Sequence, residues 1–208
     1  MFIELQNIKP AYMSEAEIGS SDIYLCESVK LQKGEKYLIK AASGHGKSSL
    51  LNFIYGANQN FEGKIQFSKT HKSIVERRRY CLSYVFQDFK LFPALSIFEN
   101  ILLKNKLTEH KTVEQIDEML ELLQLGSKKN RLVQQLSLGE RQRVAIIRAL
   151  CMNFDFLLLD EPFSHLDENN IKVATQLIKS EIENNEAGLI LTSLGSEYYF
   201  EYDKVLML

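Results

Sequence analysis

A short glycine-rich stretch carries residue types that bind phosphate. It reads Ser43-Gly44-His45-Gly46-Lys47-Ser48 and precedes a segment of helical character, residues 47–55. Glycines let backbone N–H groups turn toward an anion, and the N-terminus of the following helix adds a partial positive charge. In such a loop Lys47 reaches the β- and γ-phosphates of a nucleotide, and the Ser48 hydroxyl ligates Mg²⁺. The stretch therefore predicts a phosphate site, with an ordinary glycine-rich turn as the alternative.

One position departs from the usual pattern for this loop, G-x-x-x-x-G-K-[ST]. Ala41 stands where the first glycine is expected. Alanine fits there if its φ is negative and is strained if its φ is positive. We expect the whole loop and the start of its helix to surround the nucleotide, namely Ala41, Ala42, Ser43, Gly44, His45, Gly46, Lys47, Ser48 and Ser49.

A second motif supplies acids. The apolar run 156–159 ends in Asp160-Glu161, and such a run predicts a strand buried on both faces. Ligands of open α/β sheets bind at the carboxyl ends of the strands, so both acids are placed for chemistry. We expect Asp160 to hold Mg²⁺ through water and Glu161 to act as general base on an attacking water. A strand that ends in two acids is common by itself; with the loop it favours nucleotide hydrolysis.

Three further stretches, with these two, resemble the ABC ATPase family over nearly the whole chain. Tyr84-Val85-Phe86-Gln87, followed by Leu91-Phe92-Pro93, is similar to the family's Q-loop. Residues 136–143, Leu-Ser-Leu-Gly-Glu-Arg-Gln-Arg, resemble the signature LSGGQ-x-x-R, and residues 164–167, Ser-His-Leu-Asp, resemble the D-loop SALD. The order and spacing of all five stretches fit. The resemblance implies that Gln87 contacts Mg²⁺ and the attacking water.

The resemblance also implies a head-to-tail dimer of this chain with a second copy or a homologue. ATP bound by the loop of one chain would be closed over by Ser137, Gly139 and Glu140 of the other, and hydrolysis would release the two halves. Ser137-x-x-Glu140 is also a capping box, so plain helix initiation is the local alternative, and both readings can hold. For the aromatic that stacks on adenine we expect Tyr12; Tyr24 is the alternative, more in keeping with a strand residue.

The sequence departs from the family at two more positions. Ser193 follows Thr192 where the family has a switch histidine, and Leu138 replaces a glycine of the signature. Ser193, beside Glu161 and Gln87, is then a catalytic residue that reaches the γ-phosphate only through a water. We hypothesise that ATP binding is retained while hydrolysis is slow or depends on the partner. The alternative is a non-hydrolysing, ATP-gated dimerisation switch with a degenerate site.

Hydrophobic periodicity predicts the elements that position these motifs. Strands are expected at 2–8, 29–31, 36–40, 64–67, 82–86, 156–159, 189–191 and 205–208, the last three buried centrally. A loop is expected at 14–21, and a helix over 113–123 begins with a Thr112–Gln115 capping box and ends at Gly126. The fold class is α/β: a P-loop NTPase of ABC type with a mixed sheet core, an antiparallel β lobe and an inserted α-helical signature lobe. We expect a single domain, 1–208, with 1–86 and 156–208 as nucleotide-binding core and 87–155 as inserted lobe.

Composition and net charge limit the classes of partner that this chain is expected to bind. The formal net charge of -2 gives no basic field for nucleic acid, and no sustained heptads supply the coiled coil of a DNA-repair or chromosome-organising ABC ATPase. No apolar run is long enough to span a membrane, and Glu4 interrupts the start where a signal peptide would be apolar. The three cysteines have no zinc-like spacing, which is typical of reduced packing thiols. We expect a cytoplasmic chain, peripheral at the inner face of the membrane.

The segment 87–93 carries two aromatics, Phe89 and Phe92. They either pack inside the helical lobe or line a groove for a short cytoplasmic helix of an integral membrane permease. The run 91–100 looks most like the lipoprotein-release, macrolide-export and cell-division branch of the family.

Overall fold

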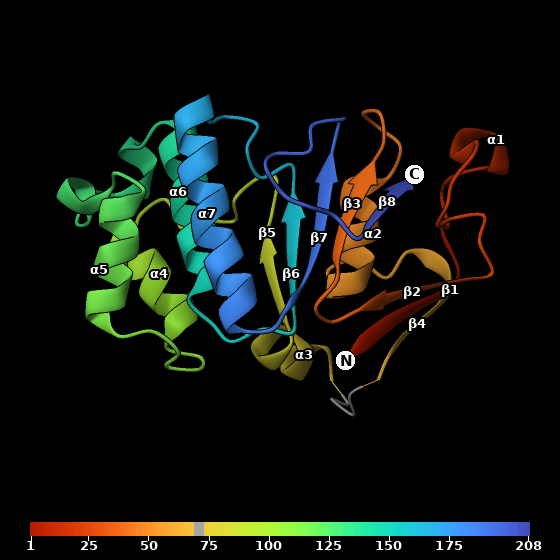
Figure 1. Cartoon of the computed structure of the whole chain (residues 1–208), viewed down its shortest axis with the longest axis horizontal. Coiled ribbons are helices and arrows are strands. Elements are labelled where there is room, and N and C mark those ends of the chain that lie inside the picture. The colour runs from red at the N-terminus through yellow and green to blue at the C-terminus, as the bar shows by residue number, and fades with distance from the viewer. Residues whose placement is uncertain (69–72) are drawn as a thin grey trace.

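Two sheets form the framework of the chain. The computed structural model describes residues 1–68 and 73–208. A five-stranded sheet has the order β5-β6-β7-β3-β8, and a three-stranded antiparallel sheet, order β2-β1-β4, lies at one end of the molecule (Figure 1). The strands are β1 Phe2–Pro10, β2 Ser28–Gln32, β3 Lys36–Lys40, β4 Phe61–Phe67, β5 Leu82–Val85, β6 Phe156–Asp160, β7 Gly188–Ser193 and β8 Lys204–Met207.

The five-stranded sheet is parallel throughout its described pairings, which corrects the predicted mixed core. The physical reason is that each connection returns the chain to the same end of the sheet before the next strand begins. Helices make most of these crossovers, and the segment 194–203 makes the last one. All strand carboxyl ends therefore meet at one edge (Figure 1).

Seven α-helices and two 3₁₀ turns are assigned in the described part of the chain. The four α-helices α4, α5, α6 and α7 lie together on the side of the molecule away from the antiparallel sheet (Figure 1). The α-helices are α1 Glu15–Ile18, α2 Lys47–Tyr55, α3 Ile74–Tyr80, α4 Ile97–Asn105, α5 Val113–Leu122, α6 Leu138–Leu150 and α7 Glu168–Asn184; the 3₁₀ turns are η1 Gly126–Lys128 and η2 Val133–Gln135.

Strand β6 divides the apolar interior into two cores. Its side chains alternate: Leu157 and Leu159 join the core beneath α4 to α7, whereas Phe156 and Leu158 join the core shared with α2 and the antiparallel sheet. Every residue of β6 and β7 is buried, as predicted for central strands. The same prediction is wrong for β8, which is mostly exposed because it pairs only with β3 at the sheet edge.

Two local predictions are also wrong. The expected loop 14–21 contains α1, which Ser14 initiates by donating its N–H and hydroxyl to the Glu17 carboxylate. Gly126 does not end α5: Gln124 takes the left-handed conformation at φ 56, and Gly126 opens η1. The Thr112–Gln115 capping box is confirmed.

Within the described residues no helix is long and apolar enough to cross a membrane.

Candidate functional site

The glycine-rich loop has the backbone that an anion cradle requires. Gly44 and Gly46 have φ of 85 and 84, a region open to glycine, and α2 begins directly after Gly46. Gly46 supplies no side-chain cap, so the first N–H groups of α2 are available to an anion. Ala41 is not among the residues with positive φ, so alanine replaces the usual glycine there without strain.

Lys47 is folded back onto its own loop. Its Nζ donates to the carbonyls of Ala41 at 2.8 Å and Ala42 at 2.9 Å, and it lies 3.4 Å from Glu161 Oε1. The side chain is 5% exposed. A buried ammonium with carbonyl partners is poised to exchange them for phosphate oxygens, which are stronger acceptors because they are charged.

Oxygen atoms gather beside Lys47. Ser48 donates to Gln87 Oε1 at 3.3 Å, and Asp160 accepts from Thr192 Oγ1 at 2.8 Å and from the Tyr84 hydroxyl at 3.3 Å. Burial raises the pKa of Asp160, while hydrogen bonds from Ser48 and Thr192 lower it. Hydroxyl, amide and carboxylate oxygens are ligands that suit Mg²⁺, which proteins hold by few carboxylates together with substrate phosphates. The donor set therefore fits that ion.

Glu161 is fixed in an uncommon backbone conformation. Its φ is 46, and its N–H donates to the Thr192 carbonyl at 3.3 Å. Its own carbonyl accepts from Gln142 Nε2 at 3.3 Å, and Gln142 Oε1 accepts from the backbone N–H of His165 at 3.0 Å. Gln142 is almost fully buried and connects α6 both to Glu161 and to His165 in the D-loop-like turn. Sequence reasoning assigned Gln142 no role.

The signature-like residues form the start of α6, away from this pocket. Ser137 and Glu140 make a complete capping box, and a hydrogen bond from Lys128 lowers the pKa of Glu140. A Cβ on Gly139 would lie 2.7 Å from the His165 carbonyl oxygen, so only glycine allows this close approach. Leu138 is 51% exposed. The structure thus supports the helix-initiation reading locally and leaves the face around Leu138 open.

Tyr12 and Tyr24 have different environments. Tyr24 is buried in a turn, not in the strand that was expected, and its hydroxyl donates to the Gly46 carbonyl at 2.9 Å. It therefore supports the loop from within. Tyr12 is 52% exposed, and its hydroxyl shares a hydrogen bond with Ser49. Of the two rings, only that of Tyr12 has a face free to stack on a base.

Ser193 ends β7 behind the loop. Its side chain is fully buried, its hydroxyl accepts from the Gly195 N–H at 3.0 Å, and its carbonyl accepts from the Ala41 N–H at 3.4 Å. The hydroxyl is thus engaged by its own chain.

One pocket of ≈ 200 Å³ brings together part of the predicted set. The residues that line it are Tyr12, Ser43, Gly44, Gly46, Lys47, Ser48, Ser49, Gln87 and Glu161. Asp160 lines an adjoining pocket of ≈ 470 Å³ that shares Ser48 and Gln87. The described residues that line the first pocket do not include Ser193, His45, Ala41 or Ala42. They also include no residue of the signature-like stretch.

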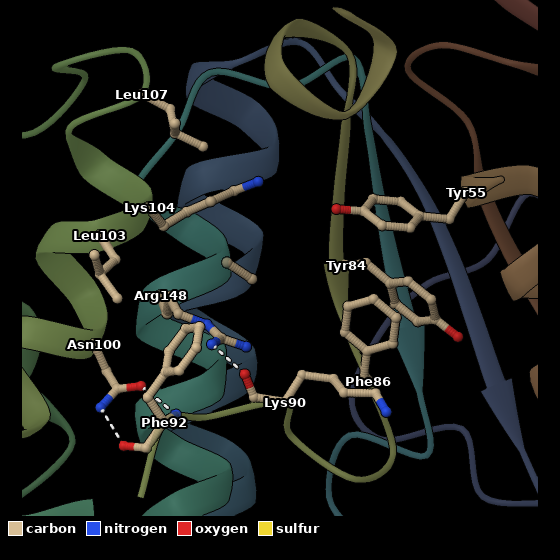
Figure 2. A pocket seen from close by; sticks show the side chains of 11 residues that line it. Tyr55, Tyr84, Phe86, Lys90, Phe92, Asn100, Leu103, Lys104, Leu107 and Arg148 are labelled. Atoms are coloured by element: carbon tan, nitrogen blue, oxygen red, sulfur yellow. Dashed lines mark hydrogen bonds between the residues drawn. The ribbon is translucent and has the colours of Figure 1, made fainter. Parts of the chain in front are cut away.

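The two aromatics of segment 87–93 lie in different environments. Phe89 is buried in the core of the helical side, whereas Phe92 is 55% exposed and lines a groove of ≈ 250 Å³. Figure 2 shows Tyr55, Tyr84 and Phe86 facing this groove from one side and Phe92 and Leu103 from the other. Phe89 therefore packs inside the helical lobe, whereas Phe92 lines a groove.

An arginine holds the turn that forms the end of this groove. Phe89 and Lys90 have φ of 63 and 48, which is uncommon for two successive non-glycine residues. Arg148 of α6 donates to the carbonyls of both at 2.6 Å, and Figure 2 shows the bond to Lys90. This clamp links the Q-loop-like segment rigidly to the signature helix.

Comparisons with known proteins agree with this geometry. The profile of the ABC transporter family matches residues 27–164. The lipoprotein-releasing system ATP-binding protein LolD of Buchnera aphidicola is 34% identical over 175 residues, 80% of this chain and 76% of that protein. The Fe(3+) ions import ATP-binding protein FbpC of Fusobacterium nucleatum is 31% identical over 186 residues, 88% of this chain and 48% of that protein.

A solved structure shares the fold. The ATP-binding cassette MJ0796, in a dimeric post-hydrolysis state bound to ADP and Pi, superposes with a TM-score of 0.79 at 28% identity, covering 99% of this chain and 94% of that one. The chain spans about half the length of several curated relatives that it matches, among them FbpC at 48%.

Proposed function

This chain belongs to the ABC transporter family, and we propose that it is the ATP-binding subunit of a membrane transport complex, coupling MgATP binding and hydrolysis to movement of a permease. The observation that carries the proposal is the meeting of Lys47, Ser48, Gln87 and Glu161 in one pocket at the carboxyl edge of a parallel sheet. The hydrogen bonds and the ion pair of these residues leave each of them placed to contact phosphate, a metal ion or water.

The contacts of these residues support the roles proposed for them. Lys47 exchanges its loop carbonyls for the β- and γ-phosphates, and the N–H groups of the loop and of α2 hold the rest of the phosphate chain. Ser48, Gln87 and, through water, Asp160 would hold Mg²⁺, which would neutralise negative charge on the phosphates. Glu161 accepts the proton of the attacking water. Tyr12 stacks on adenine.

The pocket needs a second chain to close it. The described lining of the pocket does not include Ser137, Gly139 or Glu140, which the family resemblance implies as contacts of the γ-phosphate. A head-to-tail dimer with another copy or a homologue brings them there in trans. The dimeric state of the MJ0796 cassette supports this arrangement.

The groove beside Phe92 is the proposed seat of the permease. Aromatic rings and half-exposed leucines line it, and Arg148 joins it to the signature helix. A short helix from an integral membrane subunit would seat its apolar side there. The chain would thus be peripheral at the inner, cytoplasmic face of the membrane, with residues 87–155 as the coupling lobe and no nucleic acid as partner.

Calorimetric titration with MgATP tests the proposal directly. We expect one site per chain with an affinity of ~1 μM to 1 mM, the usual range for enzyme substrates. Chelation of Mg²⁺ by EDTA should weaken binding, because Ser48, Gln87 and Asp160 then lose the ion that links them to the phosphates. Absence of saturable binding at millimolar MgATP would overturn the proposal.

We further propose that hydrolysis is slow in the isolated chain, because Ser193 replaces a histidine and its hydroxyl is already bonded to Gly195. Ser193→His should then raise steady-state turnover by about tenfold or more. One hydrogen-bond donor directed at the charge that develops in the transition state contributes ~100-fold or more to turnover. The matched control is Ser196→His, at an exposed serine in the segment that follows β7.

The outcomes separate the candidate functions. A gain only with Ser193→His identifies a weakened ATPase. MgATP binding with no turnover in either form supports the second candidate, an ATP-gated dimerisation switch, which the engaged hydroxyl of Ser193 favours. Turnover of ~1–10 s⁻¹ in the natural chain would contradict slow hydrolysis.

A further inference from the structure

A lysine on the inner wall of the groove has no acidic partner among residues 1–68 and 73–208. Lys104 projects from α4 toward the aromatic side of the groove (Figure 2). Its Nζ donates to the Arg78 carbonyl at 3.4 Å, a long hydrogen bond for a group with three donors. Burial, together with the positive charges of Arg148 and Arg78, lowers the pKa of Lys104 to about 8.

The neighbouring cations are better satisfied. Lys90 pairs with Asp88 at 2.6 Å on the surface, and Arg148 donates to two carbonyls at 2.6 Å. Arg78 donates to the carbonyls of Tyr55 and Gly56 at 3.1 and 2.7 Å. Among the described residues that line the groove there is no aspartate or glutamate. The interior of the groove thus carries net positive charge, and Lys104 is the cation there with the longest hydrogen bond.

The surroundings restrict what can supply the missing anion. Phe92, Leu103 and Leu107 are each 44–55% exposed around the mouth of the groove. A free small anion would leave these apolar surfaces in water, whereas a helix with apolar side chains around one carboxylate would cover them and neutralise the charge. Apolar contact and charge complementarity therefore specify the same occupant.

We propose that the permease segment that docks in this groove carries an aspartate or glutamate on its inserted face, and that this carboxylate pairs with Lys104. The inference rests on the proposed role of the groove and adds the chemistry of the partner. A carboxylate that meets a half-buried ammonium in an apolar groove gains a charge-assisted hydrogen bond that water screens weakly. The pair makes docking selective for one register of the incoming helix.

Two labelled helical peptides with the same apolar face, one with glutamate and one with glutamine at its centre, test the pairing by fluorescence anisotropy. The natural chain should bind the glutamate peptide about tenfold more tightly, as expected for a hydrogen bond to a charged group. Lys104→Met should bind both equally, and Lys104→Arg should keep the preference. Lys106→Met, an exposed lysine outside the groove lining, is the matched control and should behave like the natural chain. Bound glutamate peptide should also raise the pKa of Lys104, followed by ¹³C-lysine NMR.

Three results would overturn the pairing: equal binding of both peptides by the natural chain, binding of neither, or a preference that survives in Lys104→Met. MgATP binding is measured on the same samples. A chain that binds MgATP without peptide preference refutes only the carboxylate pairing. A chain that fails to bind MgATP counts against the proposed function itself.

Discussion

Lys47→Met is expected to weaken MgATP binding by at least about a hundredfold. The ammonium is 5% exposed and already directed by two carbonyls, so its donors are preorganised for phosphate oxygens. Hydrogen bonds to charged groups contribute about 1.5–3 kcal/mol each, and two of them correspond to about a hundredfold or more in affinity. Methionine keeps most of the volume and removes the charge, so the loss reports on electrostatics rather than on packing.

Calorimetry with MgATP measures this effect, and thermal unfolding of the same variant shows whether the loop carbonyls of Ala41 and Ala42 need the lysine for stability. Lys40→Met is the matched control, because Lys40 ends β3 just before the loop and pairs with Glu197 instead. Its affinity for MgATP should stay within about threefold, in keeping with a surface ion pair. An equal loss in both variants would show that the effect of Lys47 is not specific to phosphate.

The loop could be predicted because its chemistry is local. Gly44 and Gly46 adopt positive φ, which few other residues tolerate, and Lys47 follows at once on the first turn of α2. The capping boxes at Thr112 and Ser137 could be predicted for the same reason, because each needs only two residues three positions apart in the sequence. The continuous apolar run 156–159 predicts a central strand because it has no polar face, and every residue of β6 is indeed buried.

Long-range contacts set the limit of that reasoning. Nothing near Gln142 in the sequence indicates that its amide bridges Glu161 and His165, which lie in the segment between β6 and α7. Tyr24 reads as a strand residue until its hydroxyl is seen under Gly46. The last strand has an apolar sequence like the central ones, and only the sheet order, with β8 outside β3, explains its exposure.

The same limit applies to Ser193 and Ala41. The sequence shows that both differ from the family pattern, yet their consequences depend on geometry. Ala41 has no positive φ and so fits the loop, while Ser193 is buried and bonded to Gly195. One substitution is therefore conformationally neutral, and the other removes a polar group from reach of the pocket. The proposal of slow hydrolysis rests on the second alone.

Glu161→Gln should lower turnover by at least about a hundredfold and leave MgATP affinity within about threefold. A general base contributes ~100-fold to 10,000-fold, whereas the amide keeps the shape of the side chain and the backbone hydrogen bonds that hold residue 161. Lys47 loses a carboxylate at 3.4 Å and is then freer for phosphate, so binding should not suffer. ATP that is bound but not cleaved should prolong the dimer, seen as a larger species by light scattering.

Glu168→Gln, at an exposed glutamate in the first turn of α7, is the matched control and should change neither turnover nor dimer lifetime. Unchanged hydrolysis in Glu161→Gln would show that another group activates water. If the natural chain binds MgATP and dimerises but neither form hydrolyses it, the switch is the better description of the protein. Glu161 would then serve as the counter-charge that returns Lys47 to its loop when the nucleotide leaves.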